Sequence, residues 1–212
     1  MNRRLISNVC VLLLAAPLLS AHAKSKSNTN DPPPLNLLPE PKEVIVRLGG
    51  FRVTPKTKIL VQLGHQEEDR IAAETLAEEV SDHSGLRLSI LGTKVSSKAA
   101  EGAIMLVRLQ DIRVRRFLAS RGLRGDTAIG RQGYLLFSDE SHLIVAANTG
   151  QGLFSGVQTL RQLLREDGKN LICPAVTIRD WPNMEGDDAE NDNDNNDNEE
   201  RDTVVRILGP GL

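Results

Sequence analysis

This sequence is poor in aromatic residues, and that shortage argues against one class of partner. One tryptophan, one tyrosine and four phenylalanines are spread over 212 residues. Proteins that bind single-stranded nucleic acid stack the bases on aromatic side chains and gather basic residues into a patch. The basic residues of this chain are scattered along the sequence instead. We therefore expect no nucleic-acid partner.

Cysteine is equally scarce, with only Cys10 and Cys173 present. Cys10 lies in an N-terminal apolar run that we expect to be removed, so one thiol remains and no internal disulfide forms. Cys173 precedes Pro174 in an apolar strand with no histidine nearby in the sequence. A buried packing role is therefore favoured over a nucleophilic one. The fold must be held together by its hydrophobic core.

The sequence also lacks an apolar run of the roughly 20 residues that a membrane-spanning helix needs, so we expect no membrane span. Its main apolar run, residues 9–19, follows Arg3 and Arg4 and precedes Ala21-His22-Ala23. A basic start, a short apolar core and a small-x-small cleavage site are typical of a secretory signal peptide. We predict that residues 1–23 are such a signal and that the chain is exported, to the periplasm or the extracellular space.

Composition divides the remaining chain into three segments. Residues 24–36 are polar and then proline-rich, which is typical of an extended linker. Residues 37–182 alternate apolar runs with turn signals and form the expected domain. Residues 183–212 change abruptly, because residues 185–202 hold ten Asp/Glu and one Arg, a net charge of −9. We expect an acidic disordered tail, with a short apolar end at residues 203–212 for which the sequence indicates no partner.

Two helices are clear from their periodicity. Residues 149–164 carry leucine and valine at helical spacing, and Gly156 inside this stretch predicts a close approach of the helix to a sheet. Residues 66–83 form the other helix, followed by Gly85 as a C-terminal cap. The predicted buried residues are Leu153, Val157, Leu160 and Leu164 in the first helix, and Ile71, Ala72, Leu76 and Val80 in the second.

Apolar runs bounded by turn residues predict about seven strands. The eight candidate segments are residues 43–47, 51–53, 58–62, 86–91, 103–109, 132–137, 142–147 and 171–179. Residues 112–124 are ambiguous and favour a short amphipathic helix followed by a loop. Together with the two main helices, these strands predict one α+β domain.

Several patterns suggest a functional site, but none is complete. The adjacent carboxylates Asp139-Glu140 are typical of glycosidases, but they lie in a short polar connection between two strands, which favours a turn. Gly150-x-Gly152 follows a strand as a dinucleotide-binding loop does, yet the third glycine comes one place late at Gly156.

Metal-binding patterns are incomplete as well. His65 is followed by Gln66-Glu67-Glu68 and lacks the second histidine of a zinc protease. Asp192-x-Asp194-x-Asn196 in the tail lacks the glycine and the final glutamate of a calcium loop. We therefore assign no catalytic, cofactor-binding or metal-binding residue. Arginines between Arg113 and Arg124 are compatible with a polyanion-binding patch, although a solvated helix face is favoured.

Four segments together carry a family pattern. They are Leu37-Leu38-Pro39-Glu40-Pro41, Gly133-Tyr134, the stretch from Gly152 to Leu163 (GLFSGVQTLRQL), and Ile178-x-Asp180-Trp181-Pro182. Spread over residues 37–182, they resemble the N-terminal non-catalytic domain of bacterial-type β-N-acetylhexosaminidases of glycoside hydrolase family 20. The resemblance implies a mixed β-sheet with helices packed on one face, a fold described as zincin-like, without zinc.

The resemblance also implies a role. In that family the domain sits beside a (β/α)₈ barrel whose Asp-Glu pair acts with the acetamido group of the substrate. Only 30 residues follow Pro182, whereas a barrel takes about 250. We therefore expect an exported, non-catalytic domain that is inert alone and docks a barrel in cis or in trans, with Asp180 and Trp181 facing it. The alternative is a secreted carbohydrate- or envelope-binding module that uses the arginine-rich segment or the acidic tail.

Overall fold

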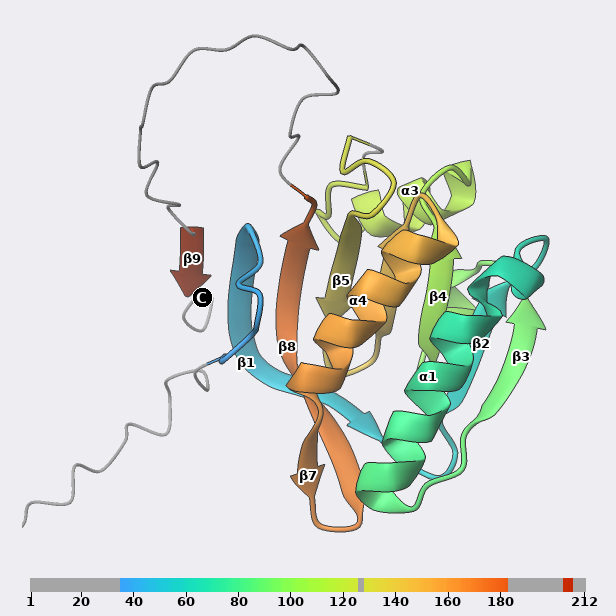
Figure 1. Cartoon of the computed structure of the whole chain (residues 1–212), viewed down its shortest axis with the longest axis vertical. Helices are drawn as coiled ribbons and strands as arrows, with labels where there is room; N and C mark the ends of the chain where they lie inside the picture. Colours follow the sequence, from blue (N-terminus) through green and yellow to red (C-terminus); the bar gives the residue numbers. More distant parts are fainter. Residues whose placement is uncertain (1–34, 126–127, 183–203, 208–212) are drawn as a thin grey trace, which may run out of the picture.

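The computed structural model describes residues 35–125, 128–182 and 204–207 (Figure 1). The predicted signal peptide, nearly all of the linker and residues 183–203 lie outside these ranges. In the described residues, the strands join into a single sheet with helices on both faces.

The sheet is mixed, as predicted. Its strand order is β3-β2-β4-β6-β5-β8-β1-β9, and β7 pairs with β8 outside this path. Strands β3, β2, β4 and β6 are parallel, β5, β8 and β1 follow with antiparallel pairings, and β9 runs parallel to β1. The strands are β1 (Glu43–Val53), β2 (Lys58–Gln62), β3 (Ser89–Thr93), β4 (Ile104–Arg108), β5 (Tyr134–Ser138), β6 (Leu143–Ala147), β7 (Arg165–Asp167), β8 (Asn170–Asp180) and β9 (Val204–Ile207).

Four strands differ from the prediction, and one of them is β3, which runs over Ser89–Thr93 where residues 86–91 were expected. The two expected segments at 43–47 and 51–53 form the single strand β1, which carries an irregularity between Val46 and Gly50. A Cβ on Gly50 would lie 2.4 Å from the carbonyl oxygen of Cys173, so the bulge needs glycine there. Strands β7 and β9 were not predicted. The apolar end of the chain, for which the sequence indicates no partner, contributes β9 beside β1.

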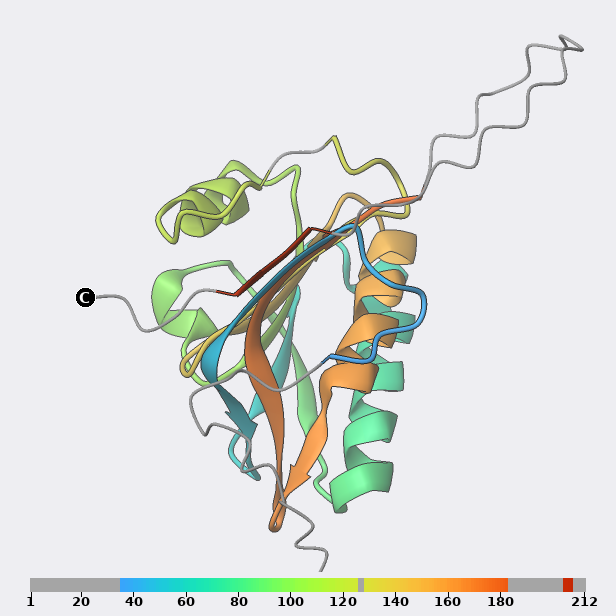
Figure 2. The ribbon, with the colours of Figure 1, turned by 90° about the vertical axis from the view of Figure 1, so that its left-hand side faces the viewer.

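The two main helices cover one face of the sheet, as predicted. Helices α1 (Gln66–Ser84) and α4 (Gly150–Leu163) lie side by side, and Figure 2 shows them on the face opposite the short helices. These short helices are α2 (Ser97–Ala100) and α3 (Ile112–Ala119). One hydrophobic cluster fills the space beneath α1 and α4, and a second lies beneath α2 and α3.

The predicted buried stripe of α1 is wrong at one position. Ala72, Leu76 and Val80 are buried, but the side chain of Ile71 is 63% exposed. The buried face of α1 is centred further round the helix, where Asp69 is fully buried because it binds an arginine of the sheet. The C-terminal cap is confirmed, since Gly85 has a φ of 70° and donates its N–H to the carbonyl of Ser81.

Helix α4 packs closely on the sheet, as its glycine predicted. Leu153, Val157 and Leu160 are fully buried, and Leu163 takes the place predicted for Leu164 because the helix ends there. A Cβ built on Gly156 would lie only 2.4 Å from Cγ1 of Val145 in β6 and 3.1 Å from Cγ of Tyr134 in β5. Glycine therefore sets the distance between α4 and the sheet.

The Gly156→Ala variant tests this packing. Alanine favours a helix by about 1 kcal/mol over glycine, but here the added methyl overlaps two core side chains. Overpacking costs typically 1–3 kcal/mol, which exceeds or cancels that gain, so we expect a net loss of up to about 2 kcal/mol in urea unfolding. Gln151→Ala, at an exposed position of the same helix, is the control and should change stability by less than about 0.5 kcal/mol. A stabilised Gly156→Ala protein would contradict the close approach.

Candidate functional site

The segments that carry the family pattern come together along α4. The backbone N–H of Leu38 donates to Oε1 of Gln162 at 2.9 Å, and Nε2 of Gln162 donates back to the carbonyl of Leu38 at 2.9 Å. About one turn earlier in the helix, the hydroxyls of Tyr134 and Thr159 share a hydrogen bond of 2.6 Å. Helix α4 is thereby tied both to the segment before β1 and to strand β5.

Asp180, at the end of β8, joins the same network. Its Oδ1 accepts a hydrogen bond from the backbone N–H of Lys42 at 3.3 Å, and its carboxylate interacts with the Tyr134 hydroxyl. Burial raises the pKa of the Asp180 carboxyl, while the N–H groups of Lys42 and Trp181 oppose this shift by stabilising the charged form. Burial also raises the pKa of the Tyr134 hydroxyl. Both groups therefore act as hydrogen-bonding partners within the domain.

Trp181 is held between two cations where the chain leaves β8. Its ring centroid lies 4.9 Å from Nζ of Lys42 and 5.4 Å from Cζ of Arg179, within reach of cation–π attraction. Nη1 of Arg179 also donates to Oε2 of Glu43 at 2.8 Å. The tryptophan is partly buried and packs against the cluster beneath α2 and α3. The expected barrel-facing role of Asp180 and Trp181 stays a prediction.

A second polar network lies at the carboxyl ends of β2 and β4. The guanidinium of Arg108 is 4% exposed and makes three hydrogen bonds of 2.5–3.2 Å to Asp69, whose side chain is fully buried. It also donates to Glu68 at 2.7 Å and to the carbonyl of Asn148 at 2.9 Å. Burial raises the pKa of the Asp69 carboxyl, and the hydrogen bonds and charge of Arg108 oppose that rise. The pair joins α1 to the centre of the sheet.

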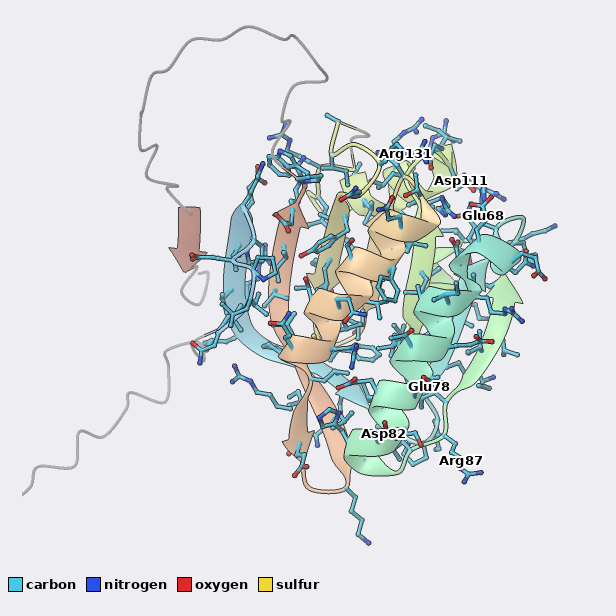
Figure 3. All side chains as sticks on the ribbon, in the orientation of Figure 1. Glu68, Glu78, Asp82, Arg87, Asp111 and Arg131 are labelled. Carbon is cyan, nitrogen blue, oxygen red and sulfur yellow. The ribbon has the colours of Figure 1, made fainter. Side chains whose placement is uncertain are left out.

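This network fills the place where α/β sheets often bind ligands. Helix α1 follows β2 on one face and α3 follows β4 on the other, so the topology switches between these two neighbouring strands. Gln62 bridges the gap, accepting from the N–H of Arg108 at 2.8 Å and donating to Asp111 at 3.0 Å. Figure 3 shows Glu68 and Asp111 at this edge. The polar side chains at this point between β2 and β4 are thus hydrogen-bonded to one another.

Asp139, one of the two adjacent carboxylates, lies in the predicted turn between β5 and β6. Its Oδ1 accepts from the backbone N–H groups of Ser141 and His142, each at 2.7 Å. The His142 ring links it onward, with Nδ1 at 3.0 Å from Asp139 and Nε2 at 2.8 Å from Nη2 of Arg121. Arg121 stacks on Phe117 at 3.8 Å. Asp139 therefore fastens the turn to the end of α3.

The arginine-rich segment begins as the predicted amphipathic helix. Helix α3 buries Val114, Phe117 and Leu118. Its Arg113 and Arg116 are exposed, while Arg115 is half-buried and donates to the carbonyls of Leu109 and Gln110. Asp111 caps it by accepting from the N–H of Arg113, and the Arg113 guanidinium holds the pKa of that carboxyl below its ordinary value.

Other candidate residues have structural surroundings. Cys173 is fully buried, and burial raises the pKa of its thiol to about 12, which is the environment of a packing residue. In the described part of the chain, no group of three or more His, Cys, Asp or Glu side chains is placed to hold a metal ion. The same residues include no helix long and apolar enough to cross a membrane. The calcium-like residues Asp192, Asp194 and Asn196 lie outside the described ranges.

Comparisons with known proteins agree with the sequence pattern. The family described as glycosyl hydrolase family 20, domain 2, matches residues 34–181. A β-hexosaminidase of Porphyromonas gingivalis is 25% identical over 188 residues, which covers 85% of this chain and 22% of that protein. A mutant β-hexosaminidase of Streptomyces plicatus matches with a TM-score of 0.52 and 27% identity, covering 72% of this chain and 27% of that one.

A β-N-acetylhexosaminidase of Streptomyces coelicolor matches similarly, with a TM-score of 0.50 and 26% identity over 68% of this chain and 26% of that one. The chain thus spans about a quarter of the length of the relatives that it matches.

The Asp69→Asn variant tests the buried ion pair. Removing one partner of a buried pair leaves the other charge uncompensated, which typically costs 3–5 kcal/mol, and we expect a loss of about 3 kcal/mol. Glu68→Gln is the matched control, since that side chain is 68% exposed and should cost less than about 1 kcal/mol. Urea unfolding followed by fluorescence of Trp181, the single tryptophan, measures both. Equal losses in the two variants would contradict a dominant role for Asp69.

The Asp180→Asn variant tests the buried carboxyl through pH. Because burial raises the folded-state pKa above the ordinary value of 3.8, the folded protein holds this proton more tightly than the unfolded chain does. The stabilisation from Asp180 is therefore fully present below that value and is lost as the pH rises through the folded-state pKa. The free energy of unfolding of the variant, relative to the wild type, should therefore rise as the pH increases above the ordinary value of 3.8. Parallel profiles would rule this out.

Proposed function

The chain belongs to the glycosyl hydrolase family 20, domain 2, family, and on this premise we propose that it is a non-catalytic structural module of an exported β-N-acetylhexosaminidase-like glycoside hydrolase. Its role is to dock a (β/α)₈ catalytic barrel that acts on amino-sugar glycans. One observation carries the proposal. The polar side chains of the family pattern, such as Gln162, Tyr134 and Asp180, bind other parts of the domain. Their role is structural, because they hold parts of the domain together.

The docking surface proposed here lies at one end of the sheet. Ile71 and Phe154 occupy the first turns of α1 and α4, and their side chains are 63% and 37% exposed. Strand β8 ends at the same end of the molecule (Figure 1), and Trp181 is the residue that follows it. Arg161, which lies seven residues after Phe154 and so on the same side of α4, pairs with Glu79 of α1. Phe154 therefore lies beside α1.

The barrel is supplied in the same polypeptide or by another chain, and it carries the sugar chemistry. The relatives named as β-hexosaminidases support this substrate class. Residues 1–23, with the order of a secretory signal, support export. N-terminal sequencing of the protein recovered outside the cytoplasm should then begin at Lys24.

A chimera tests both inertness and docking. Residues 34–182 replace the corresponding domain of the Porphyromonas gingivalis β-hexosaminidase, and both this chimera and the unmodified chain are assayed on an aryl N-acetyl-β-glucosaminide. We expect turnover from the chimera and none from the chain alone. Phe154→Glu in the chimera should destabilise the assembled enzyme by about 1.5–3 kcal/mol, the value of burying a phenylalanine.

Ile90→Glu is the matched control, because Ile90 is also 37% exposed but lies on β3 at the far edge of the sheet. Turnover by the chain alone in a contaminant-controlled preparation would overturn the non-catalytic assignment. Equal effects of Phe154→Glu and Ile90→Glu would overturn the docking surface.

A further inference from the structure

Strand β1 is enclosed by two segments from the C-terminal part of the chain. On one side it pairs antiparallel with β8, and on the other side it pairs parallel with β9. The second pairing runs from Glu43 opposite Val204 to Val46 opposite Ile207. Figure 1 shows β9 as the outermost strand beside β1. Without β9, this side of β1 would be an open edge with unpaired backbone groups.

The register of this pairing suits an apolar strand. Val205 stands opposite Val44, and Ile207 stands opposite Val46. Register partners in a sheet belong to the same face, and both valines of β1 are 5% exposed members of the core beneath α1 and α4. The backbone register therefore places Val205 and Ile207 beside the two buried valines of β1. An extended peptide with this alternation is the chemistry that the edge recognises.

The geometry of the chain favours its own tail as the occupant. Glu43 is the register partner of Arg179 in β8 and of Val204 in β9. Since neighbouring strands lie about 4.8 Å apart, β9 begins about 10 Å from the end of β8. The connecting residues have ample length for that span. Because the segment belongs to the same chain, its pairing with β1 is intramolecular and does not depend on the concentration of the protein.

We propose that the outer edge of β1, residues Glu43 to Val46, is a strand-addition site whose occupant is the chain's own segment Val204 to Ile207. Occupation in cis keeps the edge from pairing with other chains. The net charge of −9 in residues 185–202 assists, because equally charged tails of two copies repel one another. The site is distinct from the proposed docking of a barrel and does not depend on it.

The test uses the full chain with the double substitution Val204→Pro and Val205→Pro. Successive residues of a strand point their N–H groups to opposite sides, so one of two adjacent prolines removes a bond to β1 whichever way the strand faces. The matched control places both prolines in the connecting segment, as Asn195→Pro and Asn196→Pro. Hydrogen exchange is followed at the amides of residues 43–46 and 204–207.

In the wild type and the control, we expect exchange in both segments to be at least about tenfold slower than in an unstructured peptide. The double-proline variant should lose that protection at the outward-facing amides of residues 43–46 and associate with rising concentration in light scattering. A synthetic peptide of residues 203–208 should restore the protection in this variant only.

Three results would overturn the proposal. The first is wild-type exchange at residues 204–207 as fast as in the free peptide. The second is unchanged protection of β1 in the double-proline variant. The third is a wild-type dimer that the prolines dissociate, since this would assign the edge to the tail of a second copy.

Discussion

The close contact of α4 with β5 and β6 is the constraint on which the rest of this structure depends. Gly156 allows it, because any side chain there would overlap Val145 and Tyr134. At this distance the Tyr134 hydroxyl reaches Thr159 on the helix, and Gln162 reaches the backbone of Leu38. A helix held further out would bury the same leucines less completely and would leave these polar groups without their partners.

The residues of the family pattern therefore have structural roles within the domain. Its most specific segments supply a glycine for close packing, hydroxyl and amide groups for fastening, and a carboxylate at the end of β8. Each finds its partner inside the same domain. The same holds at the switch point between β2 and β4, where Gln62 and Arg108 occupy the position at which many α/β proteins bind a ligand. These side chains have their partners within the domain, and this fits the docking role proposed for it.

Burying ionised groups costs desolvation free energy, and in this fold several hydrogen bonds to each buried charge offset that cost. The Arg108–Asp69 pair uses several donors of the guanidinium, and the carbonyl of Asn148 accepts from another. Such a pair adds little net stability over an apolar contact, but it joins α1 to β4 through Asp69 and Arg108. Trp181, between Lys42 and Arg179, orders the other end of the chain in a comparable way.

The sequence by itself determined the α+β class, both main helices, most strands, and the roles of Gly156 and Gly85, because these follow from periodicity and from local backbone chemistry. It also pointed to residues 37–182 as one domain through motifs that turned out to touch one another. Tertiary structure alone decided the exposure of Ile71, the pairing of Asp69 with Arg108, the link from Asp139 through His142 to Arg121, and the seating of β9 on β1. Each of these joins residues that are distant in sequence or depends on how a helix is rotated against the sheet, and local pattern carries no information about either.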